Sequence, residues 1–209
     1  VVFMGMGEPL MNTTNVLKTI NIMKDQKCYS LSKRRITLST SGIVPEIEAI
    51  TGKTDVSLAI SLHASNDDLR NEIVPINKKY PIRDLLLSSK NYLKSLNSKS
   101  YITVEYILID KVNDSIEDAS NLVSILSDLK CKINLIPFNP FPESEYKRSS
   151  YQNVESFKNH LIKNNFIATV RTTRGDEIDG ACGQLVGKLI NPIGSKKLKK
   201  EQISARNIH

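Results

Sequence analysis

Blocks of apolar residues alternate along the chain with stretches in which apolar residues recur every three or four positions. The blocks are nearly continuous, which is typical of strands buried on both faces. They predict strands at Val1–Met4, Arg35–Ser39, Asp55–Leu62, Ile102–Ile109, Lys132–Phe138 and Phe166–Arg171. The amphipathic stretches predict helices at Asn12–Lys24, Pro45–Ile50, Asp67–Glu72, Ile82–Leu96, Ser115–Leu129 and Tyr151–Asn164. This repeated alternation predicts an α/β fold with a parallel sheet.

Two closures of such a sheet are compatible with the pattern. The sheet could be open and doubly wound, or it could form a full or partial (β/α) barrel. We expect one domain over residues 1–190, followed by a basic tail over residues 191–209. Because the chain starts with Val1 inside a strand-like run, we also expect it to be a piece of a longer protein.

The composition is that of an ordinary globular protein, with 209 residues, 40% hydrophobic and 24% charged. No apolar run approaches the roughly 20 residues needed to cross a bilayer, and the first residues do not resemble a secretory leader. We therefore expect a cytoplasmic protein that does not associate with membranes. The formal net charge of +7 suits a polyanionic partner such as nucleic acid.

The three cysteines, Cys28, Cys131 and Cys182, lie far apart in the sequence. Their number and spacing predict neither a disulfide framework nor a metal site. Cys182 lies among small and polar residues, which leave a thiol accessible for reaction. The alternative is a semi-exposed cysteine without a role.

Ligands of parallel α/β folds gather at the carboxyl ends of the strands. The first predicted strand ends in a Gly-Met-Gly-Glu-Pro segment, where Gly7 lets backbone approach a ligand and Glu8 can pair with an ammonium group. The alternative is a plain turn with a solvated Glu8. After the second strand, Ser39 and the hydroxyls that follow it can bind a sugar or a carboxylate, or they can cap the next helix.

Two further strands end in polar residues. Ser61 and His63 close the third strand and should point to the same side because side chains alternate along a strand. A histidine in this position can also serve only a local hydrogen bond. Asn139 follows the fifth strand, where its amide can bind an adenine edge or a ribose, or it can simply form a turn.

In this order and wording, the segments resemble the RlmN family of radical-SAM methyltransferases. The likeness covers Val1 to about Gly187. The segments that carry it are Gly5–Leu10, Ser32–Gly42, Ala59–Ala64, Glu72–Tyr80, Cys131–Pro137 and Arg174–Leu185.

The resemblance implies a partial (β/α) barrel that binds S-adenosylmethionine (SAM) and a four-iron four-sulfur (4Fe-4S) cluster. Such enzymes methylate carbon 2 of an adenosine in 23S rRNA and an adenosine in some tRNAs. We expect a monomer that receives electrons from a donor such as flavodoxin. By match to the family, Gly7 and Glu8 would hold the methionine end of SAM, and Cys182 would carry the methyl group. The SAM site would be completed by Ser39, Ser61, Leu62, His63 and Asn139.

The chemistry that the resemblance implies is consistent with the reactivity of adenine. An aromatic C–H bond is too weakly acidic and nucleophilic for direct displacement on SAM, so the cofactor supplies a radical route. One SAM would methylate the sulfur of Cys182. A second SAM would yield the radical that abstracts hydrogen from this methyl group, and a second cysteine would release the product by forming a disulfide.

The chain departs from the family in two respects. It contains no Cys-x3-Cys-x2-Cys run for cluster binding and no candidate for the second catalytic cysteine. In the family both lie upstream of the Gly-Met-Gly-Glu-Pro segment, so we expect a barrel truncated at its N-terminal side that does not catalyse alone. Cys28 and Cys131 match no cluster spacing and are expected to serve packing. Two other interpretations stay open, a Cfr-like enzyme that methylates carbon 8 of the same adenosine and a non-catalytic RNA-binding remnant.

Overall fold

The computed structural model describes residues 1–5, 7–141 and 144–171. The strands are β1 Val2–Phe3, β2 Thr37–Thr40, β3 Ser57–Ser61, β4 Ile102–Leu108, β5 Cys131–Pro137 and β6 Ile167–Val170. The α-helices are α1 Thr13–Lys24, α2 Val44–Ile50, α3 Asp67–Ile73, α4 Ile82–Lys94, α5 Ile116–Leu126 and α6 Tyr151–Lys163. Short 3-10 turns lie at Pro9–Asn12, Lys33–Arg35 and Pro75–Lys78. Each predicted strand and helix is therefore confirmed, with ends that shift by at most three residues.

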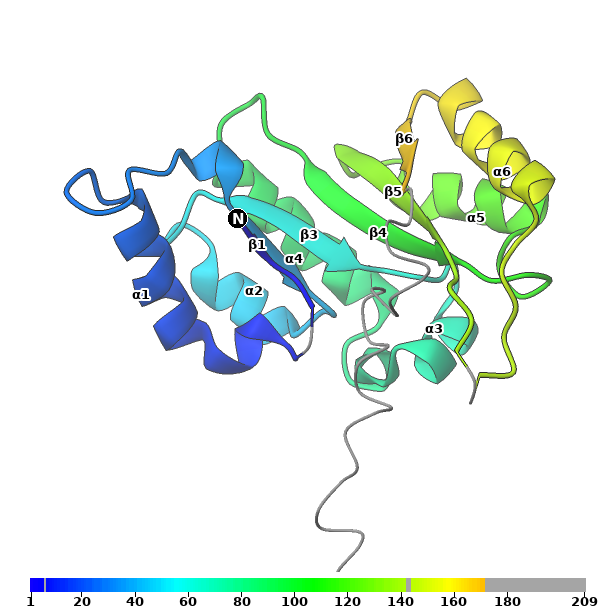
Figure 1. Cartoon of the computed structure of the whole chain (residues 1–209), viewed down its shortest axis with the longest axis horizontal. Helices are drawn as coiled ribbons and strands as arrows, with labels where there is room; N and C mark the ends of the chain where they lie inside the picture. The colour runs from blue at the N-terminus through cyan, green and yellow to red at the C-terminus, as the bar shows by residue number, and fades with distance from the viewer. Residues whose placement is uncertain (6, 142–143, 172–209) are drawn as a thin grey trace, which may run out of the picture. The chain divides into compact units, whose positions relative to one another are not determined.

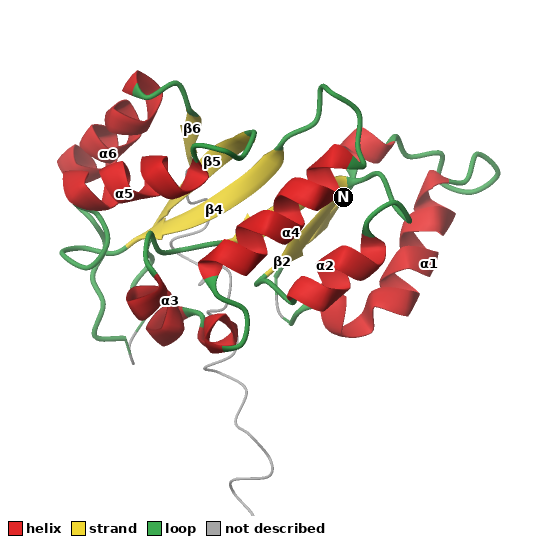
Figure 2. Ribbon diagram, turned by 180° about the vertical axis from the view of Figure 1, so that it is seen from behind, coloured by secondary structure: helices red, strands yellow, loops and turns green. Residues whose placement is uncertain are grey.

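The six strands form one parallel sheet in the order β1-β2-β3-β4-β5-β6. Figure 1 shows β3 and β4 in front of helix α4, and Figure 2, seen from behind, shows α4 in front of the strands. Helices α2 and α4 pack side by side, as do α5 and α6. A doubly wound sheet reverses its strand order and carries helices on both faces. The sequential strand order therefore indicates the (β/α)-barrel type. In this chain the barrel is an open sheet whose outer strands are β1 and β6.

The hydrophobic core lies between the sheet and its helices. Leu38, Leu58, Ile60, Val104 and Leu135 project from the strands into this core and are fully buried. The helices supply the other side of the core, among them Ile47, Ile50, Leu85, Leu122 and Phe157. Burying each such side chain contributes roughly 1.5–3 kcal/mol to the stability of the fold. Packing against the helices on this face therefore fixes the positions of the strands.

The opposite face of the sheet carries a row of polar residues across β3, β4, β5 and β6. Ser61 pairs in register with Glu105 on β4, Glu105 with Asn134 on β5, and Asn134 with Thr169 on β6. Because side chains alternate along a strand, these positions face away from the apolar core. Burial raises the pKa of Glu105, although the charge of Arg171 and a hydrogen bond from Asn134 oppose the shift.

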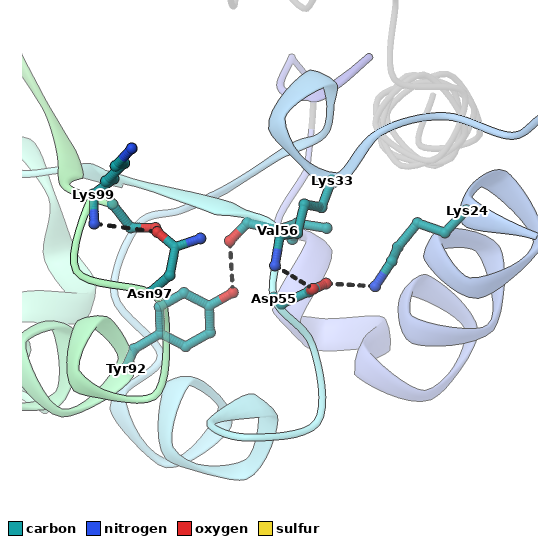
Figure 3. A network of polar contacts seen from close by, with 8 residues as sticks. Lys24, Lys33, Asp55, Val56, Tyr92, Asn97 and Lys99 are labelled. Carbon is teal, nitrogen blue, oxygen red and sulfur yellow. Dashed lines mark hydrogen bonds and ion pairs between the residues drawn. The ribbon is translucent and has the colours of Figure 1, made fainter.

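Polar contacts fix the amino end of β3 (Figure 3). Asp55 pairs with both Lys24 and Lys33, and the buried hydroxyl of Tyr92 donates to the carbonyl of Val56 at 2.9 Å. These contacts lie at the opposite end of the strand from Ser61. None of the helices in the described ranges combines the length and the apolar character needed to cross a membrane.

Candidate functional site

Glu8 connects the loops that follow β1 and β2. Its Oε1 accepts from the backbone N–H of Leu10 at 2.9 Å, which caps the first 3-10 turn. Its Oε2 accepts from both the backbone N–H and the hydroxyl of Ser41, each at 2.7 Å. Gly7 has φ +87°, a conformation that favours glycine. Glu8 is therefore a held carboxylate, and the alternative of a solvated side chain in a plain turn is wrong.

A cavity of about 480 Å³ lies along β1, within the range of small-ligand pockets. Its lining consists of Val2, Phe3, Met4, Gly5, Gly7, Glu8, Pro9, Asn12 and Val16. Of the predicted site residues that the structure describes, only Gly7 and Glu8 line this cavity.

The hydroxyls after β2 do not cap the following helix. The residue that precedes α2 is Ile43, and no side chain caps the helix. Ser41 binds Glu8 instead, and the Thr40 hydroxyl accepts from the backbone N–H of Gly42 at 3.0 Å. The capping alternative is therefore wrong. Ser39 lies on β2 and is buried.

His63 does not have the extended backbone that its predicted orientation required. Strand β3 ends at Ser61, and His63 has φ +62°. The argument that Ser61 and His63 point to one side is therefore wrong, because it requires extended backbone through His63. The ring Nδ1 of His63 accepts from the backbone N–H of Ile107 at 3.2 Å, so the ring proton lies on Nε2. His63 can thus donate one hydrogen bond from Nε2 to a ligand.

Asn113 holds the backbone around His63. Its side-chain amide donates to the carbonyls of His63 at 2.9 Å and Ile107 at 2.8 Å. Its Oδ1 accepts from the backbone N–H of Ile109 at 2.8 Å. A fully buried asparagine with these three bonds fixes the position of His63 relative to β4.

We expect His63 to make the stability of the protein sensitive to acid. Burial, together with the positive charge of Arg70, lowers its pKa from 6.5 to about 4. Between about pH 6.5 and pH 4, His63 therefore binds a proton in the unfolded state but not in the folded state. The stabilisation is complete above pH 6.5 and is lost as the pH falls toward 4, with a slope of up to about 1.4 kcal/mol per pH unit.

Urea unfolding between pH 7.5 and 4.5 measures this slope in the protein and in His63→Asn. Asparagine tolerates a positive φ better than most residues, so the variant keeps the local backbone. The variant should lose less stability than the parent over this range. Parallel curves for the two proteins would contradict the pKa shift.

Asn139 lies in a loop that aromatic contacts hold after β5. The ring of Phe138 lies 6.0 Å from that of Phe141 and 6.1 Å from that of Tyr146, measured between centroids. The Tyr146 hydroxyl donates to Glu72 at 3.0 Å, which ties the loop to α3. Asn139 itself is half-buried. It follows the carboxyl end of β5, which lies at the same end of the sheet as Glu8 and Ser61.

Sequence reasoning missed Arg70 as a residue of this region. Arg70 lies on α3, is fully buried, and donates to the carbonyls of Ser41, Ser61 and Leu62 at 2.7, 2.9 and 2.9 Å. The apolar pattern of a helix cannot identify a buried arginine. Its position two residues before the Glu72–Tyr80 segment was the available signal.

The structure thus brings together most of the predicted site. Gly7, Glu8 and the loop after Ser39 meet through Ser41, and Arg70 connects this loop to Ser61 and Leu62. Cys182 lies outside the described residues, as do the Arg174–Leu185 segment and the tail.

The described cysteines, Cys28 and Cys131, lie outside the candidate site. Cys28 is exposed in the connection between α1 and β2, at the end of the sheet opposite to the candidate site, so the prediction that it serves packing is wrong. Burial raises the pKa of Cys131 to about 12, so its thiol stays protonated at neutral pH.

Comparison with known proteins identifies the family. The model of the radical SAM superfamily matches residues 1–123. A dual-specificity RNA methyltransferase RlmN from Marinobacter nauticus is 55% identical over 90% of this chain and 51% of its own length. The RlmN of Psychrobacter arcticus is 53% identical over 90% of this chain and 47% of its own length. The chain therefore spans about half the length of the curated relatives it matches.

A solved structure agrees with these matches. The crystal structure of a radical SAM methyltransferase from Sphaerobacter thermophilus matches 88% of this chain and 53% of that chain, with a TM-score of 0.82 and 42% identity. The strand order, the one-sided helices and the sequence matches lead to the same assignment. The chain belongs to the radical SAM superfamily and, within it, to the RlmN family of methyltransferases.

Proposed function

We propose that the complete protein methylates carbon 2 of an adenosine in 23S rRNA, and of an adenosine in some tRNAs, with Cys182 as the methyl carrier. The observation that carries the proposal is the identity of 53–55% to RlmN enzymes across 90% of the chain. The held carboxylate of Glu8 supports it, because Glu8 belongs to a segment that resembles the SAM site of the family.

The residues present fit the methionine end and the ribose of SAM. A carboxylate oxygen accepts about two hydrogen bonds, and among the residues that the structure describes, Oε1 of Glu8 accepts the one from Leu10 alone. Oε1 thus keeps an acceptor position for an ammonium group. Within the described ranges, the hydroxyls of Ser39 and Ser61 make no hydrogen bond to protein. They remain available to a sugar or a carboxylate, beside Gly7, Leu62, His63 and Asn139.

The iron–sulfur cluster cannot be placed on the described residues. They contain no group of three His, Cys, Asp or Glu side chains that could bind a metal. We expect its ligands upstream of the Gly5–Pro9 segment, as in the family. When bound, the cluster and a second SAM supply the radical that activates an otherwise inert C–H bond.

The chain's own residues have separable tasks in this proposal. Glu8 binds the ammonium group of SAM, and the loop of Ser41 holds Glu8 in place. His63 is neutral near pH 7 because its pKa is about 4, so it donates from Nε2 without adding charge beside the cationic sulfonium. Cys182 takes a methyl group on its sulfur, which requires the thiolate, and carries it to the base.

The partners follow from the same proposal. They are 23S rRNA, tRNA and an electron donor such as flavodoxin, and the protein acts in the cytoplasm as a monomer that is not attached to a membrane. The net charge of +7 favours binding to RNA phosphates through counterion release.

An assay of methyl incorporation tests the proposal. The complete protein, with its cluster reconstituted, is incubated with methyl-labelled SAM, a reductant and 23S rRNA that lacks modification. We expect label in adenosine of the rRNA. Label in another nucleoside would contradict the substrate assignment, and absence of label from a cluster-loaded protein would favour the decayed remnant.

A further inference from the structure

Beside the candidate site, the guanidinium of Arg70 makes four hydrogen bonds to residues that the structure describes. It lies on the short helix α3 and is fully buried. Its Nε donates to the carbonyl of Leu62, and its Nη2 donates to the carbonyls of Ser41 and Ser61. Its Nη1 donates to Oδ1 of Asn77 at 2.8 Å. The three carbonyls belong to the residues that end β2 and β3.

Arg70 is a charged group in a costly position. Burial lowers its pKa to about 10, although the charge of Asp67 opposes the shift. The guanidinium therefore stays charged at neutral pH. Moving a charge out of water is costly unless hydrogen bonds compensate, and an apolar side chain would fill this space at less cost. Compared with an apolar side chain, the arginine adds hydrogen bonds to the ends of β2 and β3.

A second set of polar residues fixes the guanidinium itself. The side-chain amide of Asn77 donates to Oδ1 of Asp67 and to Oδ1 of Asn71, both at 2.8 Å. Oδ1 of Asp67 also accepts from the backbone N–H of Ile82 at 2.9 Å, at the start of α4. These bonds connect the guanidinium of Arg70 to the turn after α3 and to the start of α4.

The bonds of Arg70 reach Glu8 through one residue. Ser41 donates its backbone N–H and its hydroxyl to Glu8, while its carbonyl accepts from Arg70. Displacement of this carbonyl would therefore move the donors that hold the carboxylate. The carbonyls of Ser61 and Leu62 couple the same guanidinium to the end of β3.

The packing around Gly42 leaves little room for this loop to move. A Cβ at Gly42, which has φ +114°, would lie 3.2 Å from Leu85 and 3.5 Å from Nη2 of Arg70. The loop after β2 therefore lies directly against the guanidinium and helix α4.

We propose that Arg70 is a positioning residue. Its hydrogen bonds hold the carboxyl ends of β2 and β3 in fixed positions at the SAM site, and Asn77 fixes the orientation of its guanidinium. This inference rests on the proposed SAM site. Arg70 acts through Ser41, Ser61 and Leu62 and does not contact the ligand. Lysine cannot replace it, because one ammonium cannot bond in the directions that the planar guanidinium fork reaches.

The test measures SAM affinity and catalysis separately in the complete, cluster-loaded protein. Equilibrium dialysis with labelled SAM gives the Kd, and methyl incorporation into rRNA gives KM and kcat. In Arg70→Lys we expect the Kd and KM for SAM to rise about tenfold or more, and in Asn77→Ala about threefold. More SAM should also be consumed per methyl group transferred, because a loosely held ligand reacts without reaching the acceptor.

Tyr92→Phe is the matched control. It removes a buried hydrogen bond, to the carbonyl of Val56, at the amino end of the same strand β3 (Figure 3). It should lower the unfolding midpoint and leave the Kd for SAM within about twofold of the parent. A loss of SAM affinity in Tyr92→Phe equal to that in Arg70→Lys would overturn the inference, because general destabilisation would then explain both.

The remaining outcomes separate the inference from the proposed function. Parent-like SAM affinity in a folded Arg70→Lys overturns the positioning role. If Arg70→Lys does not fold, Asn77→Ala decides, and an unchanged Kd overturns it as well. A parent protein that binds SAM but leaves the rRNA unmethylated contradicts the proposed function alone, since the Kd ratios still test Arg70.

Discussion

Replacing Cys182 by serine in the complete protein is expected to abolish methylation of RNA, with a loss of at least about 10³-fold in rate. The resemblance to the RlmN family is the basis on which we propose this sulfur as the methyl carrier. A serine hydroxyl stays protonated at neutral pH and is a far weaker nucleophile toward the methyl group of SAM than a thiolate. Incorporation of labelled methyl groups into 23S rRNA measures the effect.

Cys28→Ser and Cys131→Ser are the matched controls for this substitution. Cys28 lies in the connection between α1 and β2, at the end of the sheet opposite to the candidate site, and burial raises the pKa of the Cys131 thiol to about 12, so neither is expected to react with SAM there. Both variants should methylate RNA at rates close to that of the parent. Activity that survives in Cys182→Ser would refute the role of Cys182, and activity lost equally in Cys28→Ser would show that the assay does not report on one thiol.

Glu8→Gln is expected to weaken SAM binding by about 10- to 100-fold. Glu8 accepts three hydrogen bonds, one from Leu10 and two from Ser41. A glutamine amide must turn its NH₂ group toward one set of these donors, which leaves a donor facing a donor. The substitution also removes the negative charge that pairs with the ammonium group. Equilibrium dialysis with labelled SAM gives the Kd.

Glu46→Gln controls for the loss of a carboxylate as such. Glu46 accepts from the hydroxyl of Thr13 at 2.6 Å and lies on α2, outside the predicted SAM site. Its replacement should leave the Kd for SAM near the parental value. An unchanged Kd in Glu8→Gln would remove the physical basis for placing the methionine end of SAM at this loop.

The sheet could be predicted from sequence because its strands are marked by apolar runs alone. The core residues Leu58, Ile60, Val104 and Ile133 lie within such runs, and strand–helix alternation implies parallel pairing. The choice between a barrel and a doubly wound sheet could not be made, because strand order depends on contacts between distant segments. The structure made this choice through the sequential order of β1 to β6.

The candidate site was predictable only in part. Strand ends and the family resemblance predicted Glu8 and Ser61 as candidates, but the alternation rule failed at His63, where the backbone turns to φ +62°. Arg70 and Asn113 could not be found by their periodicity. Each is a buried polar residue whose partners are backbone carbonyls of other segments, and only the tertiary structure brings those carbonyls within reach.

The position of the new methyl group on the base is the most direct test of the account. Unmodified 23S rRNA is treated with the complete, cluster-loaded protein and SAM, digested to nucleosides, and analysed by mass spectrometry against synthetic 2-methyladenosine and 8-methyladenosine. The account predicts 2-methyladenosine in an amount that approaches one per rRNA molecule. Finding 8-methyladenosine in its place, or adenosine without any added methyl group, would contradict it.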